Sequence, residues 1–452
     1  MRLSTTPLDA ALSPWAERLR QRLNLPLLVR WSGGSGLRLG DVVDVRDAAG
    51  AAALLSPSLD HLGRAYVEGH IDVSGTAHDI MDMAHRLAVA GSAEGPPGWV
   101  QRIAHRVADA VSHTRAEDRA AIQYHYDVSN AFYAEWLDPA MVYSCAYFER
   151  GDETLAAAQQ QKIDHILTKL RLQPGQTLLD IGCGWGALVL RAAEAFGARC
   201  VGITLSQNQF ELATERVRAA GLGDRIDIRL QDYRDVRGPF DRISSVGMFE
   251  HVGLKNLASY FRIVRNLLAP DGWALNHGIT SSDAHNGETR YGGGQFIGRY
   301  VFPQGELPHI GTVMTALQEG GLEPFDAESL RRHYARTLQC WSEAFEAKTE
   351  RLKALVPEKT WRIWRMYLAG CAYSFEHAWT SIHQILAVRA DRPATDRLPL
   401  TRDFTPESGK IAIYYGAADS YVGLAFTTID EVVDYIKEHS VVTTSDTEEG
   451  RR

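Results

Sequence analysis

A glycine-rich turn and two ionisable side chains downstream of it are the residues of this chain that could do chemistry together. The turn, DIGCGWG at 180–186, lies between an apolar run at 177–179 and a second apolar run at 187–190. Glycines let a ligand lie against bare backbone, and a helix that begins after the turn offers free N–H groups. Glu250 and His277 follow, and a Tyr-Ser-Cys segment at 143–145 precedes the turn. The pattern indicates an enzyme that moves a one-carbon unit and then removes a proton.

The surroundings of the turn narrow the choice of ligand. Nicotinamide, flavin and S-adenosylmethionine enzymes all use such a turn, but here an acid precedes the first glycine and the GxGxxG spacing is absent. Asp180 can orient the turn and approach the cationic end of S-adenosylmethionine. Thr204 lies near the end of the second expected strand and Gln209 follows it, where polar groups suit ribose. Asp232 and Tyr233 follow the third expected strand, where they suit adenine. We predict S-adenosylmethionine as the methyl donor; a turn that only packs a helix on a strand is the alternative.

The elements that must position these residues alternate regularly. Strands are expected at 177–181, 200–205, 226–230, 240–246 and 273–279, and helices at 159–170, 188–196, 209–220 and 257–268. This alternation predicts an α/β fold with a mostly parallel sheet and helices on both faces. The motifs all fall at the carboxyl ends of the strands, where such sheets bind ligands. After Thr280 the alternation is expected to stop, and residues 281–375 are predicted to form a helical insertion that roofs the substrate.

Composition divides the rest of the chain. Residues 1–90, with a strand at 42–45 and a helix at 80–87, form a first domain. Residues 91–120 hold a Gly/Pro-rich linker and a helix at 99–113. The apolar face of that helix either touches lipid headgroups or, in the interpretation we favour, packs on its own domain. The catalytic domain spans 121–392. The extension 393–452 contains strands at 411–415 and 421–426 and a helix that begins at Thr428.

Size and composition limit the classes of function. The 452 residues are 45% hydrophobic and 23% charged, as in ordinary globular proteins, and the net charge of −8 argues against a nucleic-acid partner. Five widely spaced cysteines without a CxxC pair predict neither a disulfide framework nor a metal site, which fits a reducing cytoplasm. No apolar run is long enough to span a bilayer, so a lipid substrate would be met at the membrane surface.

Motifs spread over residues 122–387 resemble the cyclopropane-fatty-acid synthase family, which includes the mycolic acid cyclopropane synthases. In chain order they are YHYD at 124–127, YSCAYF at 143–148, DIGCGWG at 180–186, GITLS at 202–206, MFEHVG at 248–253, HGIT at 277–280, YVFP at 300–303, HYARTL at 333–338 and YLAGC at 367–371. The resemblance implies a Rossmann-like class I methyltransferase sheet with a helical lid. It also implies a smaller N-terminal α+β domain that positions lipid, whereas the extension after residue 392 departs from the family.

The resemblance further implies the reaction and the residues that perform it. A methylene group would pass from S-adenosylmethionine to the cis double bond of an unsaturated phospholipid acyl chain, and a carbocation would lose a proton to bound bicarbonate as the cyclopropane ring closes. The matching catalytic positions are Cys145 and Ile279, chiefly through backbone, then Glu250, His277 and Tyr334 through side chains, and Cys371 as a supporting cysteine. The cofactor positions, with Asp180 and Gly186 of the turn included, are Tyr143, Ser144, Asp180, Gly182, Gly184, Gly186, Thr204, Gln209, Asp232 and Tyr233. A homodimer at the inner membrane surface is implied as well.

The residue types suit this chemistry. A proton beside a carbocation is very acidic, so a weak base suffices if it is well placed. Tyr334 and His277 can donate to an anion, and Glu250 would orient His277 or share a proton with the anion. Cys183 has no adjacent histidine, and we interpret it as a packing residue. Three alternatives stay open: a methyl-branched acyl product, methylation of a small amine, and a non-catalytic lipid-binding protein.

Overall fold

The structure is a computed structural model that describes most of the chain. It covers residues 27–31, 36–46, 57–93, 128–284, 293–302, 306–391, 410–417 and 421–428, with Gly50, Ala53, Leu54, Leu398, Pro399 and Thr401. The helices predicted at 99–113 and after Thr428 lie outside these residues. The chain divides into two compact units, Met1–Ala394 and Thr395–Arg452.

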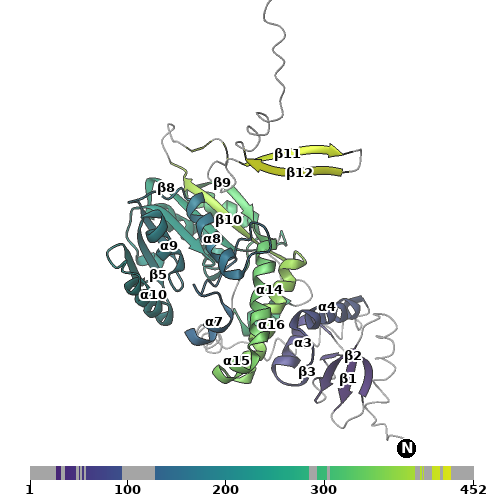
Figure 1. Cartoon of the computed structure of the whole chain (residues 1–452). Helices are drawn as coiled ribbons and strands as arrows, with labels where there is room; N and C mark the ends of the chain where they lie inside the picture. Colours follow the sequence, from purple (N-terminus) through teal and green to yellow (C-terminus); the bar gives the residue numbers. More distant parts are fainter. Residues whose placement is uncertain are drawn as a thin grey trace, which may run out of the picture. The chain divides into compact units, whose positions relative to one another are not determined.

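A seven-stranded sheet is the frame of the larger unit (Figure 1). Its strands are β4 (Thr177–Ile181), β5 (Arg199–Thr204), β6 (Ile226–Leu230), β7 (Phe240–Val246), β8 (Leu268–Ser281), β9 (Leu322–Ser329) and β10 (Thr380–Arg389). They lie in the order β6-β5-β4-β7-β8-β10-β9. Strand β10 runs in the direction opposite to the other six strands. The order reverses between β4 and β7, so a ligand crevice is expected at their carboxyl ends. The predicted α/β fold is confirmed.

Helices cover both faces of this sheet, which explains why the central strands β4, β5 and β7 are buried along most of their length. They are α8 (Leu155–Lys169), α9 (Ala187–Phe196), α10 (Gln207–Ala219), α11 (Leu257–Leu267) and α13 (Ile310–Glu319). Two of them begin earlier than predicted because a hydroxyl caps the first turn. The side chain of Thr154 accepts a hydrogen bond from the backbone N–H of Ala157, and that of Ser206 accepts one from Gln209.

We predicted from the sequence that the alternation of strands and helices stops after Thr280. This prediction is wrong. Helix α13 and strand β9 continue the alternation, and β9 pairs with β10 at the edge of the sheet. The sequence of β9, LEPFDAES, carries a proline and three acids, which are typical of an edge strand and hide its apolar pattern. The helical insertion is therefore divided into α12 (Gly293–Tyr300), before α13, and α14 (Arg331–Ala347), α15 (Thr349–Leu355) and α16 (Glu358–Glu376), between β9 and β10.

The N-terminal block packs on this insertion. It contains β1 (Leu27–Trp31), β2 (Gly36–Val45), β3 (Ile71–Val73), α3 (Leu59–Val67) and α4 (Ala77–Ala93), which confirms the predicted strand at 42–45 and helix at 80–87. The carboxylate of Glu346 on α14 accepts from the N–H of Ala77 at 3.1 Å, so it caps α4 where the helix dipole favours an anion. Arg365 on α16 donates to the carbonyl of Gly75 at 2.7 Å. Val43 and Trp364 belong to one hydrophobic core that both parts share.

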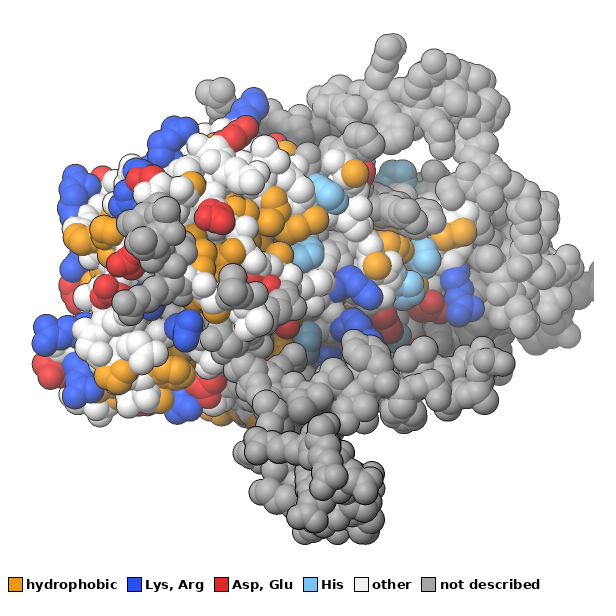
Figure 2. All heavy atoms as spheres, turned by 90° about the horizontal axis from the view of Figure 1, so that it is seen from above, with side chains coloured by type: hydrophobic (Ala, Val, Ile, Leu, Met, Phe, Trp, Pro, Cys, Tyr) orange, Lys and Arg blue, Asp and Glu red, His pale blue; other side chains and the backbone are white. Residues whose placement is uncertain are grey.

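The smaller unit contains an antiparallel pair, β11 (Lys410–Ala417) and β12 (Tyr421–Thr428), as the sequence predicts. Within the part of the chain that the structure describes, no helix has the length and apolar character needed to cross a bilayer. Figure 2 shows acidic and basic side chains interspersed over the described part of one face.

Candidate active site

The glycine turn after β4 has the shape of a ligand cradle. Gly182, Gly184 and Gly186 have φ values of +82°, +55° and +86°, in the left-handed region that glycine tolerates best. The N–H groups of Gly182 and Cys183 donate to the carbonyl of Ile203 at 3.0 and 2.9 Å, which fixes the turn to β5. A Cβ atom added at Gly184 would meet nothing within 4 Å. The turn is therefore held on one side and open at Gly184.

Asp180, the last residue but one of β4, forms the acidic end of this cradle. Its side chain is 3% exposed and accepts a hydrogen bond from the hydroxyl of Ser244 at 2.7 Å. Burial raises the pKa of Asp180 to about 6, against the opposing effects of Ser244 and of the Lys162 ammonium. Lys162 is itself buried, and burial lowers its pKa to about 8. A carboxylate and an ammonium thus share the buried space beneath the turn.

Helix α8 holds the predicted Tyr-Ser-Cys segment against the cradle. Lys162 donates to the hydroxyl of Ser144 at 2.8 Å, and Gln159 donates to the Ser144 carbonyl at 2.8 Å. The hydroxyl of Tyr143 donates to that of Tyr367 on α16 at 3.2 Å, and burial raises the pKa of Tyr143. The segment is therefore fixed from the sheet side by α8 and from the roof side by α16.

The polar groups predicted at the ends of the second and third strands contact one another or their neighbours. The hydroxyl of Thr204 donates to the side-chain carbonyl of Gln209 at 2.7 Å. Asp232 forms an ion pair with Arg234 at 2.6 Å, and the ring of Tyr233 packs edge-on against Tyr260 at 5.1 Å.

Two exposed apolar side chains at these strand ends were missed in the sequence. Leu205, directly after β5, is 74% exposed, and Leu230, at the end of the adjacent β6, is 47% exposed. Apolar side chains this exposed at a cofactor edge are suited to cover a flat ring such as adenine. The available signal was an apolar residue placed immediately after the strand end.

A second group of residues, the strand-end cluster, consists of Glu250, His277 and Ile279. Glu250 lies in a short helical turn, η2 (Phe249–His251), after β7. One carboxyl oxygen accepts from the backbone N–H of Ile279 at 2.7 Å, and the other, Oε2, is buried without a hydrogen-bond partner among the described residues. Burial raises the pKa of Glu250 to about 7, against the opposing effect of the Ile279 N–H. This carboxyl can therefore exchange a proton near neutral pH.

Gly278 allows Glu250 to come this close to β8. The ring of Phe249 occupies the space that a side chain at residue 278 would need, because an added Cβ would lie 1.8 Å from a ring carbon. Phe249 is 2% exposed, so the ring cannot move aside without disturbing the core. The glycine of the HGIT motif thus has a packing role that positions the neighbouring carboxyl.

His277 is fully buried on β8 and has a partner that the sequence did not reveal. Its Nδ1 lies 3.3 Å from the side-chain Nε2 of Gln384 on β10, and its own Nε2 has no partner among the described residues. Burial, with the positive charges of Lys162 and Lys169, lowers the pKa of His277 well below its usual range. We expected Glu250 to orient His277 or to share a proton with the anion. It does not orient His277, because its carboxyl accepts from the backbone N–H of Ile279, two residues further along β8.

Tyr334 and Cys145 meet at α14. The thiol of Cys145, which is 0% exposed, donates to the carbonyl of Leu330 at 3.8 Å, and the N–H of Tyr334 donates to the same carbonyl at 3.0 Å. The ring of Tyr334 lies 4.7 Å from that of Phe375. Burial raises the pKa of Cys145 above its usual range, so its thiol stays protonated at neutral pH and is poorly suited to nucleophilic attack.

The other two cysteines near the site also behave as packing residues. Cys371 on α16 packs against the roof core, and burial raises its thiol pKa to about 12. Cys183 lies against Gly202, where an added Cβ would be 3.0 Å from its sulfur. Both thiols would stay protonated at neutral pH, since burial raises the pKa of Cys183 as well.

A buried polar stripe on α8 lies behind the site, and the sequence gave no warning of it. Gln159, Lys162, His165 and Lys169 are all at most 3% exposed, although polar residues at helical spacing usually form a solvated face. His165 bonds Glu328 of β9 at 2.8 Å, and Lys169 forms an ion pair with the same carboxylate. The stripe was unrecognisable because the strand that supplies its carboxylate was not predicted.

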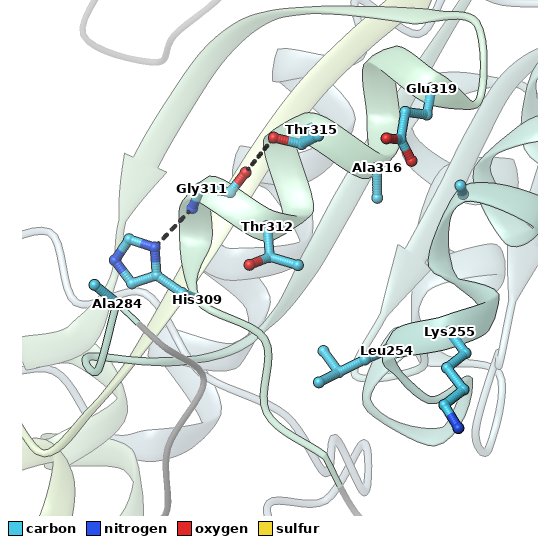
Figure 3. A pocket seen from close by; sticks show the side chains of 10 residues that line it. Leu254, Lys255, Ala284, His309, Gly311, Thr312, Thr315, Ala316 and Glu319 are labelled. Atoms are coloured by element: carbon cyan, nitrogen blue, oxygen red, sulfur yellow. Dashed lines mark hydrogen bonds between the residues drawn. The ribbon is translucent and has the colours of Figure 1, made fainter.

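An open groove lies elsewhere, between α11 and α13 (Figure 3). Lys255, Thr312 and Glu319 are among the residues that line it, and His309 accepts from the N–H of Gly311 at 3.1 Å. None of the predicted site residues lines this groove.

The sheet order, the glycine cradle at its switch point and the polar groups at the strand ends define a class I S-adenosylmethionine-dependent methyltransferase. A family model described as mycolic acid cyclopropane synthetase matches residues 113–385. The chain belongs to that family.

Relatives and solved structures agree with this assignment. A probable fatty acid methyltransferase of Pseudomonas putida is 45% identical over 392 residues, which cover 85% of this chain and 97% of the relative. The structure of the cyclopropane synthase MmaA2 from Mycobacterium tuberculosis has a TM-score of 0.58 and 37% identity, and covers 61% of this chain and 99% of its own. The mycolic acid cyclopropane synthase CmaA1, complexed with SAH and CTAB, has a TM-score of 0.57 and 38% identity, over 59% of this chain and 97% of its own.

Proposed function

We propose that the protein transfers a methylene group from S-adenosylmethionine to the cis double bond of an unsaturated phospholipid acyl chain and so forms a cyclopropane ring. The observation that carries this proposal is the pair of unpartnered buried atoms in the strand-end cluster, Glu250 Oε2 and His277 Nε2. Buried polar atoms nearly always have partners in proteins, so two such atoms beside a cofactor cradle fit a small bound anion. Bicarbonate, a weak base, meets that description.

The chain's own residues would each take a defined part. S-adenosylmethionine supplies a methyl group made electrophilic by the sulfonium. Asp180 and the open backbone at Gly184 would hold its amino-acid end, and Thr204 and Gln209 would face its ribose. His277 and Tyr334 would donate to bicarbonate, while Glu250, with its pKa of about 7, would take up or return a proton.

The aromatic roof would keep water from the cationic stage of the reaction. Tyr143 packs between Trp136 and Trp341, with ring centroids 5.5 and 5.3 Å away. Electron-rich faces stabilise a nearby cation by about 0.5–2 kcal/mol each. An apolar roof of this kind also suits an acyl chain. The relatives are named for fatty acids and mycolic acids, and we extend these lipid substrates to the acyl chain of a phospholipid here.

The cellular setting belongs to the same proposal. A phospholipid substrate places the enzyme at the cytoplasmic surface of the inner membrane, where it would bind peripherally. The N-terminal block, which packs on α14 and α16, would position lipid, and two copies would form a homodimer. We assign no role to the extension after residue 392.

The decisive experiment is incubation of the full chain with S-adenosylmethionine, bicarbonate and vesicles of unsaturated phospholipid. Mass spectrometry of the acyl chains should show the gain of one CH₂, and proton NMR should show a cyclopropane ring. Unchanged acyl chains, in a protein that binds S-adenosylmethionine by isothermal titration calorimetry, would reject the lipid substrate. Absence of cofactor binding would favour a lipid-binding protein without catalysis.

A methyl-branched product is the second candidate. The 45% identical relative is named a fatty acid methyltransferase, and the same residues would serve that reaction up to the loss of the proton. NMR of the product separates the two, because a branch gives a methyl signal and no ring protons. A small amine as methyl acceptor is tested in parallel with ethanolamine or a simple secondary amine in place of the vesicles.

A further inference from the structure

We propose that Gln384 is a positioning residue that donates its amide N–H to Nδ1 of His277 and thereby keeps the ring proton on Nε2. The inference rests on the proposed function for the identity of the anion that Nε2–H would face, but the ring state itself can be measured without any turnover. Gln384 lies on β10, after the last motif that carries the family resemblance, YLAGC at 367–371. It belongs to none of those motifs.

The hydrogen-bond chemistry of an amide decides the ring state. The Nε2 of Gln384 lies 3.3 Å from Nδ1 of His277, and an amide nitrogen can only donate. In this arrangement Nδ1 is the acceptor, and a neutral imidazole that accepts at Nδ1 carries its proton on Nε2. That Nε2 is the buried atom without a partner among the described residues. An amide turned by 180° would instead accept from Nδ1–H through its oxygen, and the NMR experiment below distinguishes the two.

The position of Gln384 is fixed from both sides. In the sheet register it lies opposite His277 of β8 and opposite Glu328 of β9, and its side chain is fully buried. Oε2 of Glu328 already takes hydrogen bonds from His165 and Lys169. The amide nitrogen of Gln384 lies on the other side, within 3.3 Å of the imidazole.

The charges around the ring favour the neutral form. Lys162 and Lys169 of α8 and His165 oppose a positive charge on His277, and Glu328 favours it. Glu328 is already paired with Lys169. A neutral ring with Nε2–H can donate to an anion, whereas the opposite tautomer would present a lone pair and repel it.

The test uses the full chain labelled with ¹⁵N-histidine. The NMR signals of His277, identified by their loss in His277→Asn, should show a protonated Nε2 and an unprotonated Nδ1. Gln384→Glu, of nearly equal shape, places an acceptor beside Nδ1 and should move the ring proton from Nε2 to Nδ1. In that variant kcat for cyclopropane formation should fall about tenfold to a hundredfold, the range for losing a hydrogen bond to a charged group. The KM for S-adenosylmethionine should stay within about twofold.

Two controls separate positioning from a general loss of structure. Gln173→Glu makes the same change at an exposed loop and should alter neither the ring signals nor kcat. Gln384→Met removes the donor without adding charge and should leave both tautomers populated, with an intermediate kcat.

The outcomes distinguish the two proposals. A proton on Nδ1 in the wild-type protein overturns the role of Gln384, whether or not the protein makes a cyclopropane. An unchanged ring and unchanged kcat in Gln384→Glu overturn it as well. A protonated Nε2 in a protein that binds cofactor but forms no cyclopropane leaves the tautomer assignment standing and overturns the proposed function.

Discussion

Two glutamates, one in the turn after β7 and one on the edge strand β9, have opposite electrostatic surroundings. Glu250, in the strand-end cluster, has one backbone N–H as its partner and a pKa of about 7. Glu328, at the edge strand β9, faces His165 and Lys169. Burial alone would raise the pKa of Glu328, but these partners outweigh burial and lower it to about 2.

The difference shows which carboxyl is better suited to exchange a proton at neutral pH. A carboxylate that accepts from a lysine and a histidine resists protonation, so it stabilises the fold. A carboxyl left with one unpartnered oxygen is costly to bury and is poised to exchange a proton, as functional groups often are. The surroundings therefore favour a structural role for Glu328 and support the reactive role that we propose for Glu250.

The largest expected effect is on turnover at the unpaired carboxyl. Glu250→Gln keeps the shape of the side chain and its acceptor oxygen but removes the exchangeable proton. We expect kcat to fall by about 10²–10⁴-fold, the range for loss of a general acid or base. The affinity for S-adenosylmethionine, measured by titration calorimetry, should be nearly unchanged, and Tyr334→Phe should show the same division. Equal losses of binding and turnover would count against the roles given to both residues.

The paired carboxylate should respond in stability instead. Glu328→Gln leaves the Lys169 ammonium buried. The remaining carboxylate near it among the described residues is that of Asp326, at 4.0 Å. Breaking a buried ion pair from one side costs about 3–5 kcal/mol, which urea denaturation would detect. Glu250→Gln is the matched control, because it makes the same change at a carboxyl with no charged partner. If Glu328→Gln were as stable as the wild type, the ion pair would have no structural role.

The pH dependence of stability should separate the two glutamates by sign. The pKa of Glu250 is raised by folding, so its contribution to stability is present at low pH and is lost as the pH rises through about 7. The pKa of Glu328 is lowered, so its contribution is present above its ordinary value and is lost as the pH falls toward about 2. Relative to the wild type, Glu250→Gln should therefore gain stability between about pH 5 and 8, by no more than roughly 3 kcal/mol. A constant difference across that range would contradict the raised pKa.

The smallest effect is expected at an exposed ion pair. Arg191 and Asp164 lie 2.8 Å apart with about a third of each side chain exposed, at 36% and 34%. Asp164→Asn should cost less than about 1 kcal/mol of unfolding free energy, because water replaces much of a surface pair. A loss as large as that of Glu328→Gln would show that pairing, and not burial, sets the size of the effect.

Much of the fold was readable from the sequence because its strands and helices are local patterns. The boundaries of β4, β6 and β7 match the predicted strands, and the glycine cradle follows from three glycines after a strand. The prediction of Thr204 and Gln209 as cofactor positions comes from the same kind of local pattern, and their side chains bond each other at 2.7 Å. These features depend on residues close together in the chain, where periodicity and turn chemistry are reliable guides.

The parts that could not be predicted depend on partners far away in the chain. Lys169 looks like a solvated residue until Glu328 is placed opposite it, 159 positions later. The orientation of His277 depends on Gln384, which lies on a strand that the sequence pattern did not reveal. Edge strands with charged residues and buried polar pairs both contradict the hydrophobic pattern on which sequence interpretation depends.

The position of β10 has a consequence for how the molecule is synthesised. This strand is the last of the large sheet to leave the ribosome, yet it fits between β8 and β9, and its glutamine meets a histidine 107 positions earlier. Closing so long a loop is slow, and until it closes both neighbouring strands have unsatisfied edges. A nascent chain that ends in the helical roof would therefore already have its glycine turn but would lack a working catalytic centre.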